Sequence, residues 1–195
     1  MVAGIILAAG RSTRMGTPKA LLLAPDGLTF VARLIRTLVR GGIDAPLVIG
    51  RLDDEALQAE VESAGARLVI NPEADEGGQL SSLLAGLRKA DRPGVRGLLV
   101  IPVDAPMVMP DTVARLIAVF SDTSGAIIRA RYRGRNGHPV IFSRSLFDEL
   151  RHASRDAGAK AVLRAHHDTI INVDLDDPGV VGDIDTPEDY RHLVD

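Results

Sequence analysis

The sequence contains no cysteine, and this absence excludes several kinds of site. A disulfide framework, a zinc site built on thiolates and a cysteine nucleophile all require that residue. Any metal ion must therefore be held by oxygen atoms or by imidazole nitrogen.

Long apolar runs are lacking too. No stretch approaches the roughly 18 consecutive apolar residues of a membrane-spanning helix, and the N-terminus has no basic segment followed by a long apolar core. The sequence therefore predicts neither a signal peptide nor a membrane span, and it predicts a cytoplasmic location.

There is no large excess of charge of either sign. The chain has 26 acidic and 23 basic residues, a net charge of −3, so a general nucleic-acid or membrane surface is not expected and the partner should be a small molecule. Lysine is scarce and occurs only as Lys19, Lys89 and Lys160. The lysine in the glycine-bearing loop, Lys19, therefore indicates that a compact positive charge has a role at that place.

A length of 195 residues suits a single domain, which we assign to 1–195. The apolar segments are continuous rather than alternating, and helical segments separate them. This pattern predicts an α/β fold with a parallel sheet covered on both faces, and ligands beyond the carboxyl ends of its strands. The expected strands are 3–8, 46–50, 66–70, 97–103, 125–131 and 169–173, and the expected helices are 30–40, 53–64, 83–90 and those that start near 110, 158 and 187.

The stretch 5–19, IILAAGRSTRMGTPK, is the most informative part of the chain. A buried strand runs directly into small, hydroxylated and cationic residues. Gly10 lets a ligand approach backbone N–H groups, while Arg14 and Lys19 bring charges suited to phosphate oxygens. Neither G-x-x-x-x-G-K-[ST] nor G-x-G-x-x-G is present, so by itself the stretch could also be an ordinary strand-to-helix turn with exposed basic residues.

This stretch resembles the signature L-A-A-G-x-S-x-R-M-G-x-x-K of the MobA-like nucleotidyltransferases and matches each of its fixed positions. Within that family the chain looks most similar to the molybdenum cofactor cytidylyltransferases. The resemblance implies a Rossmann-like, three-layer α/β/α fold with a mostly parallel sheet, of the nucleotide-diphospho-sugar transferase type. It also implies that the backbone of Leu7, Ala8, Ala9 and Gly10 holds base and ribose, and that Arg14 and Lys19 hold the triphosphate.

A second loop, 71–82, follows the expected strand 66–70. From its residues alone it could be a solvated turn in which Ser81 or Ser82 caps the next helix. The family has a base-reading loop of the form N-P…G-x-x-S-S-L…G-L at this place. The resemblance therefore implies nucleotide contacts by Asn71, Gly78 and Ser82, with Gly86 matching the last glycine.

Two acidic segments carry candidate metal ligands. Asp104 follows the apolar strand 97–103 and precedes Ala105-Pro106, so its carboxylate should point into the ligand crevice rather than cap the helix that starts at Pro110. Asp183 and Asp185 share one side of an extended segment, which is costly for like charges without a cation. The resemblance makes Asp104 and Asp183 the expected Mg²⁺ ligands, with Asp185 in reserve.

The C-terminal half carries two segments that resemble acceptor-binding elements of the cytidylyltransferases. One is Gly137-His138-Pro139 with Phe142, similar to G-x-P-x-x-F, and the other surrounds Lys160, where the family usually has arginine. His138 by itself is predicted to be an ordinary surface or core histidine and is not among the expected catalytic residues.

Together these features predict an Mg²⁺-dependent enzyme that transfers CMP from CTP to a molybdopterin-type acceptor and releases pyrophosphate, with Arg14, Lys19 and Asp104 as catalytic residues. CTP is favoured over GTP because Ala9 stands where guanylyl-transferring relatives carry glycine, and its methyl group narrows the space beside the base. The alternatives are a sugar-phosphate nucleotidyltransferase, a D-x-D glycosyltransferase and a nucleotide-binding regulatory module without catalysis. The sequence indicates neither the oligomeric state nor a molybdoenzyme or chaperone partner.

Overall fold

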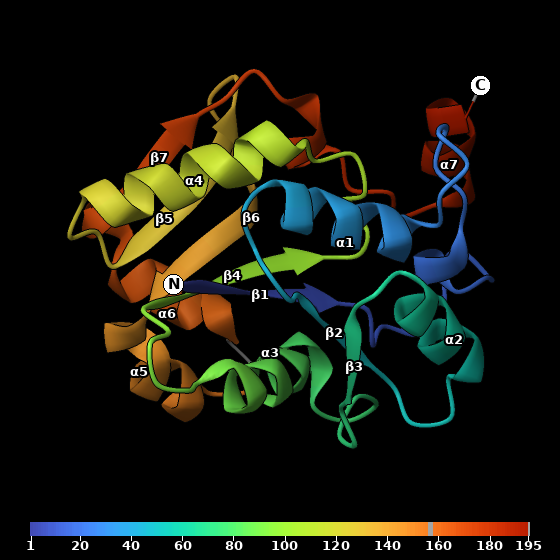
Figure 1. Ribbon diagram of the computed structural model, residues 1–195, viewed down its shortest axis with the longest axis horizontal. Helices are drawn as coiled ribbons and strands as arrows, with labels where there is room; N and C mark the ends of the chain where they lie inside the picture. Colours follow the sequence, from blue (N-terminus) through green and yellow to red (C-terminus); the bar gives the residue numbers. More distant parts are fainter. Residues whose placement is uncertain (156–157, 195) are drawn as a thin grey trace.

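The computed structural model describes residues 1–155 and 158–194. Its centre is a seven-stranded sheet in the order β3-β2-β1-β4-β6-β5-β7 (Figure 1). Within it, β6 runs antiparallel to both of its neighbours, β4 and β5, while the other pairs are parallel. The strands are β1 (Val2–Leu7), β2 (Leu47–Gly50), β3 (Arg67–Ile70), β4 (Gly97–Pro102), β5 (Ile127–Tyr132), β6 (Arg135–Ser143) and β7 (Ile170–Asp174).

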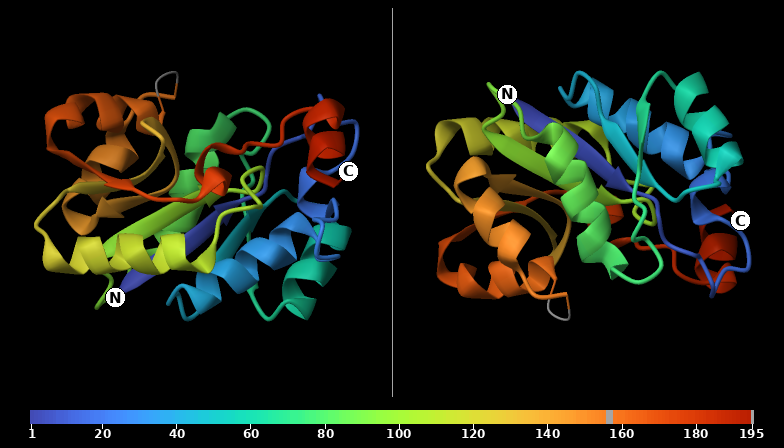
Figure 2. Two further views of the ribbon diagram at one scale, coloured as in Figure 1. Left: turned by 90° about the horizontal axis from the view of Figure 1, so that it is seen from above. Right: turned by 90° about the horizontal axis from the view of Figure 1, so that it is seen from below.

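Helices cover both faces of this sheet (Figure 2). One face packs against α1, α2 and α4, and the other packs against α3, α5 and α6. Consecutive strand residues belong to opposite cores: Ile5 faces α3, whereas Ile6 faces α1. The bounds are α1 (Phe30–Arg40), α2 (Glu55–Ser63), α3 (Gly78–Ala90), α4 (Pro110–Asp122), α5 (Phe147–His152), α6 (Ala159–Ala165) and α7 (Pro187–Val194). The expected three-layer α/β/α architecture is confirmed.

The expected strands agree with the observed ones to within two residues at each end. An N-cap explains where α1 starts, because Thr29 Oγ1 accepts a hydrogen bond from the N–H of Ala32 at 3.2 Å. The predicted start of α3, at residue 83, was wrong. The helix begins at Gly78, so Ser81 and Ser82 lie inside it and neither caps it. Ser81 Oγ instead donates to the carbonyl of Gly78 at 2.8 Å, which ties the first turn of α3 to itself.

The start of α4 depends on a carboxylate far away in the sequence. Asp177, only 1% exposed, accepts hydrogen bonds from Met109 N and from Thr112 Oγ1. Asp104 therefore does not cap this helix, in agreement with its expected orientation toward the crevice.

Helix α7 is attached at the surface and has no fully buried side chain. Asp189 Oδ2 accepts from the N–H groups of Asp185 and Thr186, and this fixes the turn that leads into the helix. Tyr190 Oη donates to the carbonyl of Leu23 at 3.0 Å, and its ring meets Phe30 edge-on. These contacts place the segment before α7 beside the loop that follows β1 (Figure 1).

Among the residues that the structure describes, no helix has the length and apolarity needed to cross a membrane.

Candidate active site

The loops that follow β1, β3 and β4 meet at the carboxyl edge of the parallel strands, together with the segment before α7. They enclose a cavity of about 300 Å³. Eight of the expected site residues line it: Leu7, Ala9, Gly10, Arg14, Lys19, Gly78, Ser82 and Asp104. Its other lining residues include Ser12, Thr13, Gln79 and Asp185.

Three expected residues do not line this cavity. Ala8 packs into the core on the α1 face, Asn71 is buried at the start of the second loop, and Asp183 is an exposed residue near enough to Asp104 and Asp185 to feel their charges. Asn71 Nδ2 donates to Ser81 Oγ at 2.8 Å and to Ser82 Oγ at 3.0 Å. Asn71 therefore shapes the loop instead of facing the cavity.

The loop after β1 presents backbone donors to the cavity. Within the described part of the chain, the N–H groups from Gly10 to Arg14 have no hydrogen-bond acceptor. The loop is closed by Ser12, whose carbonyl accepts from Met15 and Gly16 and whose Oγ accepts from Lys19 N at 3.1 Å. Successive free N–H groups in a tight loop form a concave site for anions such as phosphate.

Lys19 is the central cation of the cavity and is only 9% exposed. Its Nζ lies 2.6 Å from Asp185 Oδ1 and 3.4 Å from Asp104 Oδ2. The other oxygen of Asp185 lies 3.1 Å from Arg14. These contacts, with the Lys19 hydrogen bond foremost, hold the pKa of Asp185 below its usual range. Both oxygens of Asp185 are thus engaged by cations.

Asp183 has the opposite environment. Partial desolvation raises its pKa, and repulsion from Asp104 and Asp185 raises it further, while Lys19 and Arg135 oppose the shift. Among the described residues it has no ion-pair partner. A carboxylate that faces two others without a bound cation is the arrangement that a divalent metal ion relieves.

The protein supplies only part of a metal coordination shell. Within residues 1–155 and 158–194, no group of three or more histidine, aspartate or glutamate side chains is arranged to hold a metal ion. Asp104 and Asp183 suit Mg²⁺ nonetheless, because Mg²⁺ commonly binds to one or two carboxylates and takes its remaining ligands from phosphates and water.

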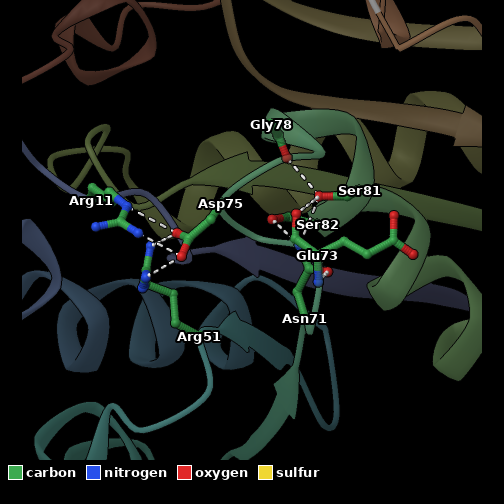
Figure 3. Close-up of polar contacts among 8 residues, drawn as sticks. All are labelled: Arg11, Arg51, Asn71, Glu73, Asp75, Gly78, Ser81 and Ser82. Atoms are coloured by element: carbon green, nitrogen blue, oxygen red, sulfur yellow. Dashed lines mark hydrogen bonds and ion pairs between the residues drawn. The ribbon is translucent and has the colours of Figure 1, made fainter.

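Another carboxylate, Asp75, ties together the loops that follow β1, β2 and β3 (Figure 3). Arg11, from the loop after β1, donates to both of its oxygens, at 2.9 Å and 2.6 Å. Arg51, which follows β2, forks onto the same two oxygens. These two guanidinium groups, Arg51 first, lower the pKa of Asp75. This clamp could not be predicted from the sequence, since nothing in the sequence pairs residues 64 and 24 positions apart.

A second cavity, of about 340 Å³, adjoins the first and shares Leu7 and Gln79 with it. Its walls are mostly apolar, with Arg155 and Lys160 as the cations. Lys160, in the segment expected to bind the acceptor, thus lines this second cavity. The remaining lining residues are Leu80, Leu83, Val100, His138, Val140, Phe142, Gly158, Ala159 and Leu163.

The arrangement of a glycine-bearing anion loop, a buried lysine and an acidic cluster agrees with a comparison against known families. The sequence model of the MobA-like NTP transferase domain matches residues 4–170. This chain belongs to that family. As a MobA-like protein it is a nucleotidyltransferase that acts on a nucleoside triphosphate.

Several characterised proteins are similar to this MobA-like chain over most of its length. The purine catabolism protein PucB of Bacillus subtilis is 28% identical over 96% of this chain and 93% of its own. Nicotine blue oxidoreductase of Paenarthrobacter nicotinovorans is 30% identical over 99% and 96%. A molybdenum cofactor guanylyltransferase of Burkholderia vietnamiensis is 33% identical over 87% and 84%.

The fold is also found in solved structures. Rv0371c of Mycobacterium tuberculosis superposes with a TM-score of 0.84 at 29% identity, covering 100% of this chain and 98% of that one. The same protein was solved in complex with manganese, with a TM-score of 0.79 at 30% identity over 99% and 97% of the two chains. A divalent metal ion is thus found in a structural relative of this chain.

Proposed function

We propose that this protein transfers CMP from CTP to a molybdopterin-type acceptor and releases pyrophosphate, with Mg²⁺ as its metal ion. The observation that carries the proposal is the pair of adjoining cavities. The first combines free N–H groups, Lys19 and Asp104, and the second presents Lys160 and Arg155 above apolar walls. Because Leu7 and Gln79 line both, a nucleotide in the first would lie next to an acceptor in the second.

The proposed reaction needs positioning and charge neutralisation rather than a covalent nucleophile. An oxygen of the acceptor phosphate attacks the α-phosphorus of CTP in line, and the bond to the β-phosphate breaks. The N–H groups of the Gly10 loop would hold the triphosphate oxygens, and Lys19 with Arg14 would stabilise the negative charge that develops on the leaving pyrophosphate. Asp104 and Asp183 would hold Mg²⁺, which supplies further charge neutralisation when bound.

The identity of the base depends on the space beside Ala9. Its side chain is 4% exposed and lines the first cavity, so its methyl group limits the room for a base. A pyrimidine should therefore fit better than a purine. The guanylyltransferase among the relatives makes GTP the direct competitor.

The first test ranks CTP, GTP, ATP and UTP by pyrophosphate release with molybdopterin as acceptor. CTP is expected to be preferred by about 10- to 200-fold, the range that shape discrimination worth about 1–3 kcal/mol provides. Preference for GTP would reassign the base, and activity only with a sugar phosphate would reassign the acceptor. Release of a nucleoside diphosphate from a sugar nucleotide, supplied in place of the nucleoside triphosphate, would instead indicate a glycosyltransferase.

The relative named nicotine blue oxidoreductase supports one alternative, a reduction of an organic substrate. The two activities differ in their products. Consumption of NADH or NADPH without pyrophosphate release would favour the reductase. Pyrophosphate release that needs both CTP and molybdopterin could not come from a reductase activity and would favour the nucleotidyltransferase.

Gly10 provides a test that separates ligand binding from folding. A Cβ added to Gly10 would have no protein atom within 4 Å, and its φ does not lie in the left-handed region. Gly10→Ala should therefore leave the thermal unfolding temperature unchanged or slightly higher, because alanine restricts the unfolded chain. Its affinity for CTP should fall at least about tenfold, as expected for a methyl group forced into a tight ligand contact.

Gly137→Ala is the contrasting variant. A Cβ there would overlap the backbone carbonyl of Val180, so this substitution should destabilise the fold by about 1–3 kcal/mol or more. Thermal unfolding and calorimetric CTP titration of both variants provide the comparison. Normal CTP affinity in Gly10→Ala would show that the nucleotide does not approach this backbone.

A further inference from the structure

His138 lies where the second cavity approaches the acidic cluster. It is near the start of β6, which runs antiparallel to β4, so this end of β6 returns to the carboxyl edge at which β4 ends. His138 lines the second cavity, and it is close enough to Asp104 to feel the charge of that carboxylate. A residue that lines the second cavity and lies near an aspartate of the first is well placed to contact an acceptor.

The imidazole of His138 is not satisfied by the protein. Its Nδ1 is buried without a hydrogen-bond partner in the described part of the chain. Buried polar atoms are usually paired, and an orphaned one costs about 1–3 kcal/mol. The fold therefore gains no hydrogen bond from Nδ1 in return for burying a histidine here.

The tautomer of this imidazole follows from its surroundings. Burial lowers the pKa of His138, and the charge of Asp104 only partly opposes that shift, so the ring is neutral at pH 7. No protein group accepts a proton from Nδ1, which favours the tautomer with the proton on Nε2. Nε2 also lacks a protein partner among the described residues, but it is not sealed from solvent as Nδ1 is. It is therefore a donor available to a ligand.

The other side chains of the second cavity differ from this donor in chemistry. Most are apolar, Lys160 and Arg155 offer charges suited to an anionic group, and the amide of Gln79, where the cavity meets the first one, is the other neutral polar group. A neutral donor in such walls selects a different feature: a carbonyl oxygen or an unprotonated ring nitrogen on an otherwise flat, apolar ligand. A hydrogen bond in a dry site discriminates strongly, because a ligand without the matching acceptor leaves the donor unpaired.

We propose that His138 is a specificity-determining residue for the second substrate, which it recognises by donating a hydrogen bond from Nε2 to a carbonyl oxygen or ring nitrogen of the acceptor. The inference rests on the proposed function, because it assigns the second cavity to the acceptor. It adds a residue that the sequence analysis set aside, and it assigns that residue to the ring system of the acceptor rather than to its phosphate.

The test compares His138→Leu with His138→Gln. Leucine removes both nitrogen atoms, whereas glutamine places an amide donor near the position of Nε2. We expect His138→Leu to raise the KM for molybdopterin about tenfold or more, to change the Kd for CTP less than about twofold, and to leave the unfolding temperature unchanged or higher. His138→Gln should restore the KM to within about threefold of the wild type. His167→Leu, an exposed histidine outside both cavities, is the matched control and should change none of these values.

Two results would overturn the inference while leaving the proposed function standing. One is an active His138→Leu variant with an unchanged KM for molybdopterin. The other is a lowered unfolding temperature together with equal losses for both substrates, the behaviour of a structural histidine. A wild-type protein that releases no pyrophosphate with any nucleoside triphosphate and molybdopterin would overturn the proposed function, and the inference with it.

Discussion

Asparagine in place of Asp104 is expected to lower kcat by about two to three orders of magnitude or more while the fold remains intact. The substitution preserves the size of the side chain but removes one of the two carboxylates proposed to hold Mg²⁺. It also leaves Lys19 with Asp185 as its remaining ion-pair partner. Charge stabilisation at the leaving pyrophosphate should be lost, since removing even a single hydrogen-bond donor that stabilises a transition state costs about 10²–10³ in rate.

The measurement is pyrophosphate release at saturating CTP over a range of Mg²⁺ concentrations, with thermal unfolding as the check on folding. Asp122→Asn, at the exposed end of α4, is the matched control and should behave as wild type. If Asp104→Asn keeps more than about a tenth of the wild-type rate, a smaller loss than one such donor accounts for, Asp104 is not a metal ligand.

Alanine in place of Lys19 should reduce kcat by about 10²–10³ and weaken CTP binding by less than about tenfold. A charge on the leaving phosphates contributes most when the bond breaks, so its loss affects the transition state more than the bound nucleotide. Lys19 also lowers the pKa of Asp185 and opposes the upward shift of the Asp183 pKa. Without it Asp104 and Asp185 would share the cavity with Arg14 as the remaining lining cation, which should make the variant depend on higher Mg²⁺ concentrations.

Steady-state kinetics and direct titration of CTP separate these effects. Lys89→Ala removes an exposed lysine on α3 and serves as the control of equal charge change. A raised KM with unchanged kcat in Lys19→Ala would show that the lysine contributes to binding CTP in the ground state and does not selectively stabilise the transition state.

The layers of the fold could be predicted because they depend on local patterns. Continuous apolar strands such as 97–103 can be buried only if both sheet faces are covered, and helical segments of suitable length separate them. The start of α3 could not be predicted from the serines, because Gly78, at a φ of 59°, and the contacts of Ser81 set the first turn. A local capping preference was outweighed by the conformation of the preceding loop.

In the candidate site too, some features could be predicted from the sequence and others could not. Asp104 could be predicted because it lies just after β4, and Lys19 because it ends the glycine-bearing loop that follows β1; the carboxyl ends of both strands define the crevice. The pairing of Lys19 with Asp185 joins positions 166 residues apart, and the clamp on Asp75 joins residues from three loops. Such partners are set by the order of strands in the sheet, which no local pattern contains. For the same reason His138 was predicted to be an ordinary histidine, although the reversed direction of β6 brings it into the lining of the second cavity.

Because α7 is attached only at the surface, the sheet can remain folded while the site loses one of its parts. Because this helix has no fully buried side chain, it can detach in a local unfolding event that leaves both cores in place. Asp185, in the turn that Asp189 fixes, would then lose its position beside Lys19 and Arg14. The amide protons of α7 should therefore exchange with solvent faster than those of α1, and bound nucleotide that orders the cations of the cavity should slow that exchange. In the free protein, some molecules would then have an intact sheet but an incomplete site. Their fraction would depend on how firmly α7 is anchored, chiefly through Tyr190 and Asp189.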